Sequence, residues 1–221
     1  MSIAKQNGLS LADQVAHELR EDIIDGRLLS GMPLVESELV RGYNASRNTV
    51  REALHLLGRE GLTTYVRHKG VIVRRLSVDD VRDLFMVRRT LESRAILGGK
   101  PLADQHSQRM ADALDAADLA CEREDWRAFG SHSLRFHQHV VGLLHSPSFD
   151  EFFTNIVAQM RLVFSAAPDE ARYQAPWLER DRHIHQLLID GHRAEAGDAM
   201  DSYLNDSEQQ ALDLLSSVAR P

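Results

Sequence analysis

The side chains best suited to chemistry lie between Ser46 and Leu54, a segment that predicts one helix with two unlike faces. The first face is apolar, with residues spaced i, i+3, i+4 and i+7: Val50, Ala53, Leu54 and Leu57. The second face carries hydrogen-bond donors: Arg47, Asn48, Thr49, Arg51 and His55. Because Ser46 is a favourable N-cap, these donors gather at the positive end of a helix dipole, which suits contacts with phosphates and base edges. The segment favours a helix that lies on DNA, with an ordinary amphipathic helix and a solvated basic face as the alternative.

Histidines form a second concentration of reactive side chains, since seven of the eleven lie between residues 132 and 192. They are His132, His137, His139, His145, His183, His185 and His192. Their spacing contains no HExxH pair, and the sequence has no nucleophile elbow or phosphate-binding loop. We therefore expect most of these histidines to be exposed or packed, and the sequence argues against an enzyme.

The elements around the basic segment predict a helix-turn-helix. Apolar residues with helical spacing predict helices over 11–25 and 36–43. Residues 44–45 form a tight turn into the third helix, over 46–61. Two helices joined by such a turn, the second polar and basic at its start, are typical of a helix-turn-helix.

A β-hairpin is predicted directly after these helices, because strand formers over 62–66 and 71–73 flank a basic turn. A hairpin in this position makes a winged helix, whose tip reaches the DNA backbone or minor groove. The expected tip residues are Arg67, His68 and Lys69. A plain surface hairpin is the alternative, but the position beside the third helix favours the wing.

The rest of the sequence predicts an all-helical bundle. After a short linker over 74–76, Ser77 caps a new helix, and no convincing strand follows. The six expected helices cover 79–98, 103–123, 125–145, 149–166, 177–191 and 193–218. Prolines such as Pro168 mark the breaks. We expect a mainly α protein, with a winged helix-turn-helix domain over 1–75 and an all-helical domain over 76–221.

The net charge of −7 is unevenly distributed, which keeps nucleic acid open as a partner. Residues 1–75 carry 11 Lys/Arg and 9 Asp/Glu, whereas residues 76–221 carry 15 and 24. Within 41–75 the balance is 8 basic to 2 acidic residues. A basic patch joined to an acidic region suits a protein whose only polyanion contact is N-terminal.

The single cysteine, Cys121, excludes an internal disulfide and offers no metal-binding spacing. No apolar run approaches the roughly 18 residues of a membrane span, and the N-terminus lacks the pattern of a secretory signal. We expect a cytoplasmic protein that has no membrane partner.

Successive blocks of the N-terminal region resemble the GntR-family winged helix. The blocks are Gly26–Gly31, Leu34–Leu39, Ser46–Leu54, Leu56–Leu62 and Gly70–Val73. Other segments resemble the helical effector domain of the FadR subgroup, called FCD: Asp83–Glu92, Phe136–His137, Ser146–Pro147 and, more loosely, Ile184, Gly191 and Ala199–Met200. The resemblance implies a homodimeric transcriptional regulator that binds a palindromic operator in double-stranded DNA.

The resemblance places operator contacts in the helix-turn-helix and the wing. The contact residues would be Ser37, Ser46, Arg47, Asn48, Thr49, Arg51, His68, Lys69 and Gly70, beside the tip residue Arg67. Arg47 and Arg51 are the expected base readers, because arginine can grip guanine through two hydrogen bonds. Ser46 and Thr49 are expected to contact the DNA backbone and so position the helix on it.

Many effector domains of this type bind a divalent metal through an Asp, a His four residues later and two further His. The corresponding positions hold Ser133, His137, Asp181 and Tyr203. This set is incomplete, which disfavours a metal and leaves His137 and Asp181 as the candidate ligands.

The same positions favour a pocket for a small organic acid. Its polar lining would be Arg88, Ser133, His137, Asp181 and Tyr203. An arginine in such a pocket suits a carboxylate. The alternative for Arg88 is a salt bridge to Glu92 at i+4.

The resemblance also implies allosteric control, in which a metabolite bound in the helical domain changes operator affinity. Repression relieved by the metabolite is the commoner arrangement in the family. The alternative is an architectural or adaptor DNA-binding protein that takes no small-molecule effector.

Overall fold

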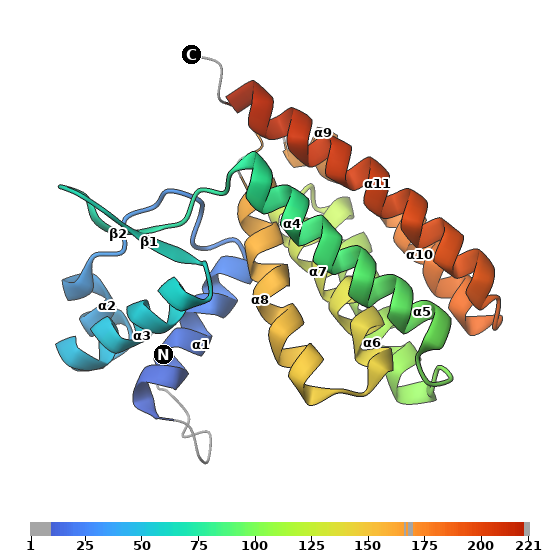
Figure 1. The fold of residues 1–221 in the computed structure, drawn as a ribbon, viewed down its shortest axis with the longest axis horizontal. Helices are drawn as coiled ribbons and strands as arrows, with labels where there is room; N and C mark the ends of the chain where they lie inside the picture. Colours follow the sequence, from blue (N-terminus) through green and yellow to red (C-terminus); the bar gives the residue numbers. More distant parts are fainter. Residues whose placement is uncertain (1–9, 166, 168–169, 219–221) are drawn as a thin grey trace. The chain divides into compact units, whose positions relative to one another are not determined.

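The computed structural model describes residues 10–165, 167 and 170–218, which fold into two compact units, Met1–Arg75 and Leu76–Pro221 (Figure 1). The first unit combines helices with a small β-hairpin, and the described part of the second is entirely helical. The expected mainly α class is confirmed.

The first unit is organised around α3 (Arg47–Arg59), which packs against α1 (Leu11–Ile24) and α2 (Glu36–Gly42). The apolar stripe expected on α3 forms the buried contact: Val50, Ala53, Leu54 and Leu57. Arg20 of α1 forms a bidentate ion pair with Glu60, just beyond α3. The N–O distances are 2.6 and 3.0 Å. The helix that carries the basic side chains is therefore fixed by its apolar face and its C-terminal end.

The hairpin consists of β1 (Thr63–Val66) and β2 (Gly70–Val73), paired antiparallel with Val66 opposite Gly70. Its turn places His68 in the left-handed region, at φ 66°. The sequence prediction ended the turn one residue later, since Gly70 already pairs in β2 at φ 75°. An isolated bridge between Pro33 and Ile72 was not predicted, because a single pair of residues leaves no periodic pattern.

The second unit begins with a continuous helical run in three parts. These are α4 (Val78–Arg88), the π-helical turn η1 (Arg89–Ser93) and α5 (Arg94–Gly98). Ser77 caps α4 as predicted, in a reciprocal capping box with Asp80. The single helix expected over 79–98 thus contains a π-turn that the apolar spacing did not reveal.

The remaining helices complete the bundle. They are α6 (Asp104–Glu122), α7 (Trp126–Val141), the 3₁₀ turn η2 (Gly142–Leu144), α8 (Pro147–Phe164), α9 (Glu170–Gln174), α10 (Trp177–Ile189) and α11 (Arg193–Val218). Helix α7 packs against α6 and α8, while α11 packs against α10 and α4 (Figure 1). The short helix α9 was not predicted, and five residues are too few to set up an apolar period. Residue 166, where the fourth expected helix ends, and the predicted break at Pro168 lie outside the described residues.

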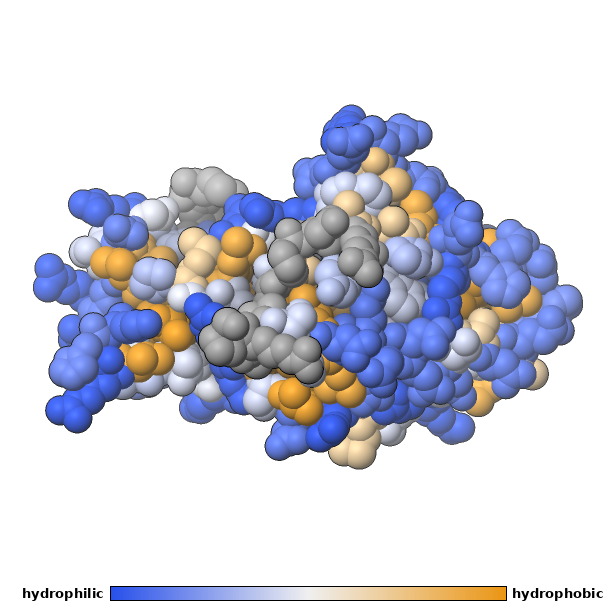
Figure 2. Space-filling model, turned by 90° about the horizontal axis from the view of Figure 1, so that it is seen from above, coloured by the Kyte–Doolittle hydropathy of each residue, from blue (hydrophilic) through white to orange (hydrophobic). Residues whose placement is uncertain are grey.

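Within the part of the chain that the structure describes, no helix is long and apolar enough to cross a membrane. Figure 2 shows hydrophilic residues over most of the face in view, with hydrophobic residues in small groups between them.

Candidate nucleic-acid interface and effector site

The N-terminus of α3 is fixed by Ser46, whose side-chain oxygen accepts a hydrogen bond from the Thr49 amide at 3.1 Å. The hydroxyl oxygens of Ser46 and Thr49 also lie within hydrogen-bond distance, 2.8 Å apart. The cap satisfies a backbone donor that the helix itself leaves unpaired, and it orients the first turn. The Ser46 hydroxyl therefore has a structural task, in addition to the DNA contact expected for it.

The residues expected on the DNA-binding surface lie on the outside of the first unit. The exposed ones are Ser37, Ser46, Arg47, Asn48, Arg51, Arg67, His68 and Lys69, whereas Thr49 and Gly70 are half-buried. Positively charged side chains thus extend from the start of α3 and from the turn of the hairpin. Two such basic elements are what a winged helix presents to DNA.

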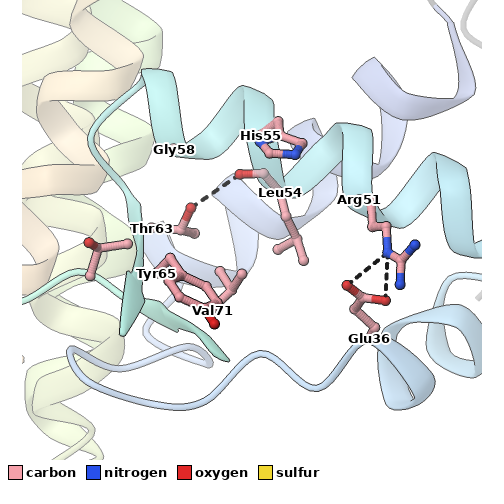
Figure 3. A pocket seen from close by; sticks show the side chains of 9 residues that line it. Glu36, Arg51, Leu54, His55, Gly58, Thr63, Tyr65 and Val71 are labelled. Atoms are coloured by element: carbon pink, nitrogen blue, oxygen red, sulfur yellow. Dashed lines mark hydrogen bonds and ion pairs between the residues drawn. The ribbon is translucent and has the colours of Figure 1, made fainter. Parts of the chain in front are cut away.

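Arg51 is held by a carboxylate whose proximity no sequence pattern indicates. Its Nε lies 3.0 Å from both carboxylate oxygens of Glu36, at the start of α2 (Figure 3). Hydrogen bonding to Glu36 and its charge raise the pKa of Arg51 above its ordinary value. The two residues are fifteen positions apart and meet only because α2 packs on α3, so their spacing gave no signal.

Two grooves run along α3, and Arg51 and His55 line both of them. The first, of about 390 Å³, lies between α3 and the hairpin (Figure 3). Tyr65 lines this groove and is 74% exposed. The second groove, of about 640 Å³, includes Asn48 and Glu52. Tyr65 thus joins His55, which the sequence already placed on the donor face of α3, in the candidate interface. The sequence marked Tyr65 only as a strand former.

In the second unit, four helices bring together the five residues expected to bind an effector, and all five are buried. They are Arg88 on α4, Ser133 and His137 on α7, Asp181 on α10 and Tyr203 on α11. The Ser133 hydroxyl donates a hydrogen bond to Asp181 at 2.7 Å. The ring centroids of His137 and Tyr203 lie 4.7 Å apart. Residues far apart in the sequence therefore form one polar cluster.

The centre of this cluster is Glu92, which lies in the π-turn η1 and is fully buried. Arg88 Nε donates to one carboxylate oxygen at 2.7 Å, and His137 Nδ1 lies 2.5 Å from the other. The Arg88–Glu92 ion pair considered from the sequence therefore forms, but inside the bundle, with side-chain exposures of 2% and 0%. The i+4 spacing predicts that Arg88 and Glu92 pair, whereas the burial of the pair depends on how the helices pack.

The charges in the cluster stabilise one another against the cost of burial. Burial alone raises the pKa of Glu92, but the charges of Arg88 and His137 outweigh it and lower the pKa. Burial alone lowers the pKa of His137, and the charge of Glu92 outweighs it and raises the pKa. Both shifts favour an imidazolium paired with a carboxylate.

Three buried polar atoms of the cluster have no hydrogen-bond partner among the described residues: Arg88 Nη2, His137 Nε2 and Asp181 Oδ1. The last two lie 3.4 Å apart, an ion-pair distance without the geometry of a hydrogen bond. A buried donor or acceptor without a partner costs free energy and is a feature to be explained. Here one guanidinium donor, one imidazole nitrogen and one carboxylate oxygen share a single cluster.

The cluster does not fit the divalent metal that the family pattern implies. Ser133 replaces a carboxylate and Tyr203 replaces an imidazole, while His137 Nδ1 is already bonded to Glu92. The described residues contain no group of three or more His, Cys, Asp or Glu arranged to hold a metal ion. Of the two neighbouring histidines on α10, His183 is exposed and His185 is buried, so they face different sides of the helix.

The chain matches two family models: "Bacterial regulatory proteins, gntR family" over residues 11–73 and "FCD domain" over residues 83–206. A solved structure from Rhodococcus sp. RHA1, described as a putative transcriptional regulator GntR, is 34% identical, with a TM-score of 0.85. The match covers 93% of this chain and 99% of that one.

Two curated relatives also match along most of their length. The galactonate operon transcriptional repressor of Escherichia coli K12 is 26% identical, and the match covers 96% of each chain. A probable D-xylose utilization operon transcriptional repressor of Paenarthrobacter nicotinovorans is also 26% identical, over 86% of this chain and 80% of that relative. The protein is a member of the GntR family of bacterial transcription regulators, in the FadR subgroup, with an N-terminal GntR helix-turn-helix and a C-terminal FCD domain.

Proposed function

We propose that this regulator is a repressor that binds a palindromic DNA operator as a homodimer. A small hydroxylated carboxylate, bound in the polar cluster of the second unit, would release the DNA. Residues 1–75 form the DNA-binding domain in this proposal, and residues 76–221 form the effector-binding and dimerisation domain. The protein would act in the cytoplasm, where its operator lies.

The exposed start of α3 supports the DNA-binding part of the proposal. Arg47 and Arg51 extend from its first two turns, so their guanidinium groups can reach base edges in a major groove. The hairpin turn supplies Lys69 and Arg67 for phosphate contacts. A dimer presents two such surfaces, which matches the two-fold symmetry of a palindrome.

The unpartnered guanidinium nitrogen is the observation that carries the effector part. Arg88 is 2% exposed, and its Nη2 has no acceptor among the described residues, although its Nε is bonded to Glu92. A carboxylate is a strong acceptor for such a donor, because the hydrogen bond is charge-assisted. His137 Nε2 and Asp181 Oδ1 would serve a hydroxyl group, which both donates and accepts.

The name of one relative agrees with this chemistry, whereas the other is named for D-xylose, which has no carboxylate. One relative represses an operon named for galactonate, which is a carboxylate with several hydroxyl groups. We infer that this chain takes a ligand of the same class, and that its cluster holds the ligand without a metal ion. Arg88 then supplies the fixed positive charge.

The position of Arg88 also suggests how binding changes operator affinity. A ligand shifts a conformational equilibrium only if it binds the two states unequally. A carboxylate bound at Arg88 Nη2 would place a second negative charge beside the Arg88–Glu92 pair at the end of α4, and would favour the arrangement of this helix that accommodates it. Helix α4 begins at Val78, three residues after the first unit ends at Arg75, so it is the first helix after the linker between the two units. A change in α4 can therefore reach the first unit through that linker.

A ligand screen tests the proposal. Full-length protein is mixed with sugar acids and, as matched controls, with the corresponding uncharged sugars and alditols. We expect a sugar acid to raise the melting temperature and to release DNA selected from a random pool, and the uncharged analogues to do neither. If no hydroxylated carboxylate alters DNA binding, the alternative of an architectural or adaptor protein is favoured.

A further inference from the structure

We infer that Glu36 determines how strictly the protein distinguishes its operator from other DNA. It positions Arg51, and it lowers the affinity of the protein for non-specific DNA. The inference rests on the proposed reading of DNA by α3. It adds an acidic residue, on a different helix, to the side chains that set base specificity.

The geometry leaves only one end of the Arg51 side chain available. Nε is bonded to both oxygens of Glu36 at 3.0 Å, whereas Nη1 and Nη2 have no hydrogen-bond partner among the described residues (Figure 3). The Arg51 side chain is nevertheless 58% exposed. The guanidinium is thus oriented without being buried.

This orientation selects one way of gripping a base. An arginine can bond guanine O6 and N7 through Nη1 and Nη2, or through Nε and one Nη. Glu36 blocks the second arrangement and leaves the first. It also fixes part of the side chain before DNA arrives, which reduces the conformational entropy lost on binding.

The charge of Glu36 acts against binding to DNA of the wrong sequence. A carboxylate beside the DNA surface repels phosphates, and it neutralises an arginine that would otherwise bind any phosphate. On non-specific DNA, an arginine that is neutralised by Glu36 attracts phosphates weakly, so few counterions are released from the DNA. At the operator, two hydrogen bonds to guanine offset the repulsion. The ratio of specific to unspecific affinity therefore rises, even though total affinity falls.

Glu52 provides a matched control for this argument. It lies on α3 next to Arg51 in the sequence, it is exposed, and it lines the same groove as Asn48 and Arg51. No ion pair joins it to Arg51 in the described part of the chain. Glu52→Gln therefore removes one negative charge from the same surface and leaves Arg51 held by Glu36.

The test uses full-length protein and an operator selected from random DNA. Affinities of the wild type, Glu36→Gln, Glu52→Gln and Arg51→Ala are measured for the operator, for each of its single-base-pair variants and for an unrelated duplex, at several salt concentrations. Thermal melting checks that each variant is folded.

We expect Glu36→Gln to bind unrelated DNA several-fold more tightly, with a salt slope steeper by about 0.9 for one further phosphate contact. It should also lose discrimination at the same base pairs as Arg51→Ala, by about 5-fold or more. Glu52→Gln should keep the wild-type base preferences.

Two results would overturn the inference in distinguishable ways. If Glu36→Gln and Glu52→Gln give the same base preferences, Glu36 contributes only charge, and the reading of DNA by α3 is unaffected. If Arg51→Ala keeps every base preference, Arg51 reads no base, and the proposed interface itself fails together with the inference.

Discussion

Replacing Arg88 with methionine tests whether the buried cluster holds the second unit together. Arg88 and Glu92 have side-chain exposures of 2% and 0%, and their closest N–O distance is 2.7 Å. Removing one partner of a buried pair leaves an uncompensated charge and costs about 3–5 kcal/mol, whereas an exposed helical pair is worth a few tenths. For a chain of this size, about 2–4 °C per kcal/mol gives a fall in melting temperature of roughly 6–20 °C.

The same helix supplies the control. Arg82 pairs with Asp79 at 3.3 Å, but these side chains are 61% and 92% exposed, so Arg82→Met should cost less than about 1 kcal/mol. Thermal unfolding followed by circular dichroism measures both variants. In the double variant Arg88→Met/Glu92→Gln, the carboxylate charge that Arg88 balanced is removed together with Arg88, so part of the loss should be recovered. Equal small losses for Arg82→Met and Arg88→Met would refute the idea of a strongly coupled buried pair.

Three further predictions concern protonation, capping and metal content. The raised pKa of His137 contributes stability that is complete below the ordinary value of 6.5 and is lost as the pH rises through the raised pKa. The difference in unfolding free energy between wild type and His137→Gln should therefore shrink above pH 6.5, and a difference that grows would contradict the ion pair. Ser46→Ala removes the cap of α3 and should cost about 1 kcal/mol in chemical denaturation, while Ser46→Asp, which keeps an acceptor, should cost much less. Elemental analysis of protein purified without a nickel column should find no stoichiometric divalent metal, and one bound metal per chain would overturn the metal-free proposal.

Local signals in the sequence were enough for the winged helix. The apolar stripe on α3, the cap at Ser46 and the strand formers around the basic turn are all short-range patterns, and each element forms within a few residues of its expected bounds. Such patterns report the periodicity of a single helix or strand. They do not report which side chains meet across two elements.

The features that the sequence did not predict depend on tertiary packing. Glu36 meets Arg51 only because α2 lies against α3. Glu92 becomes the centre of the buried cluster because the π-turn places it between Arg88 and His137. An i+4 pair looks the same in the sequence whether it is exposed or buried, so the importance of Glu92 could not be read from spacing.

The most direct test of the central claim is the release of operator DNA by a carboxylate that depends on Arg88. Fluorescence anisotropy of a labelled operator is followed while a sugar acid is added to wild-type protein and to Arg88→Lys. The lysine keeps the positive charge beside Glu92 but lacks the second guanidinium nitrogen that the proposal assigns to the ligand. We predict that the wild type releases the operator, and that Arg88→Lys binds the operator equally well but needs at least about ten-fold more ligand to release it. Equal ligand sensitivity in the two proteins would contradict an effector site at this cluster.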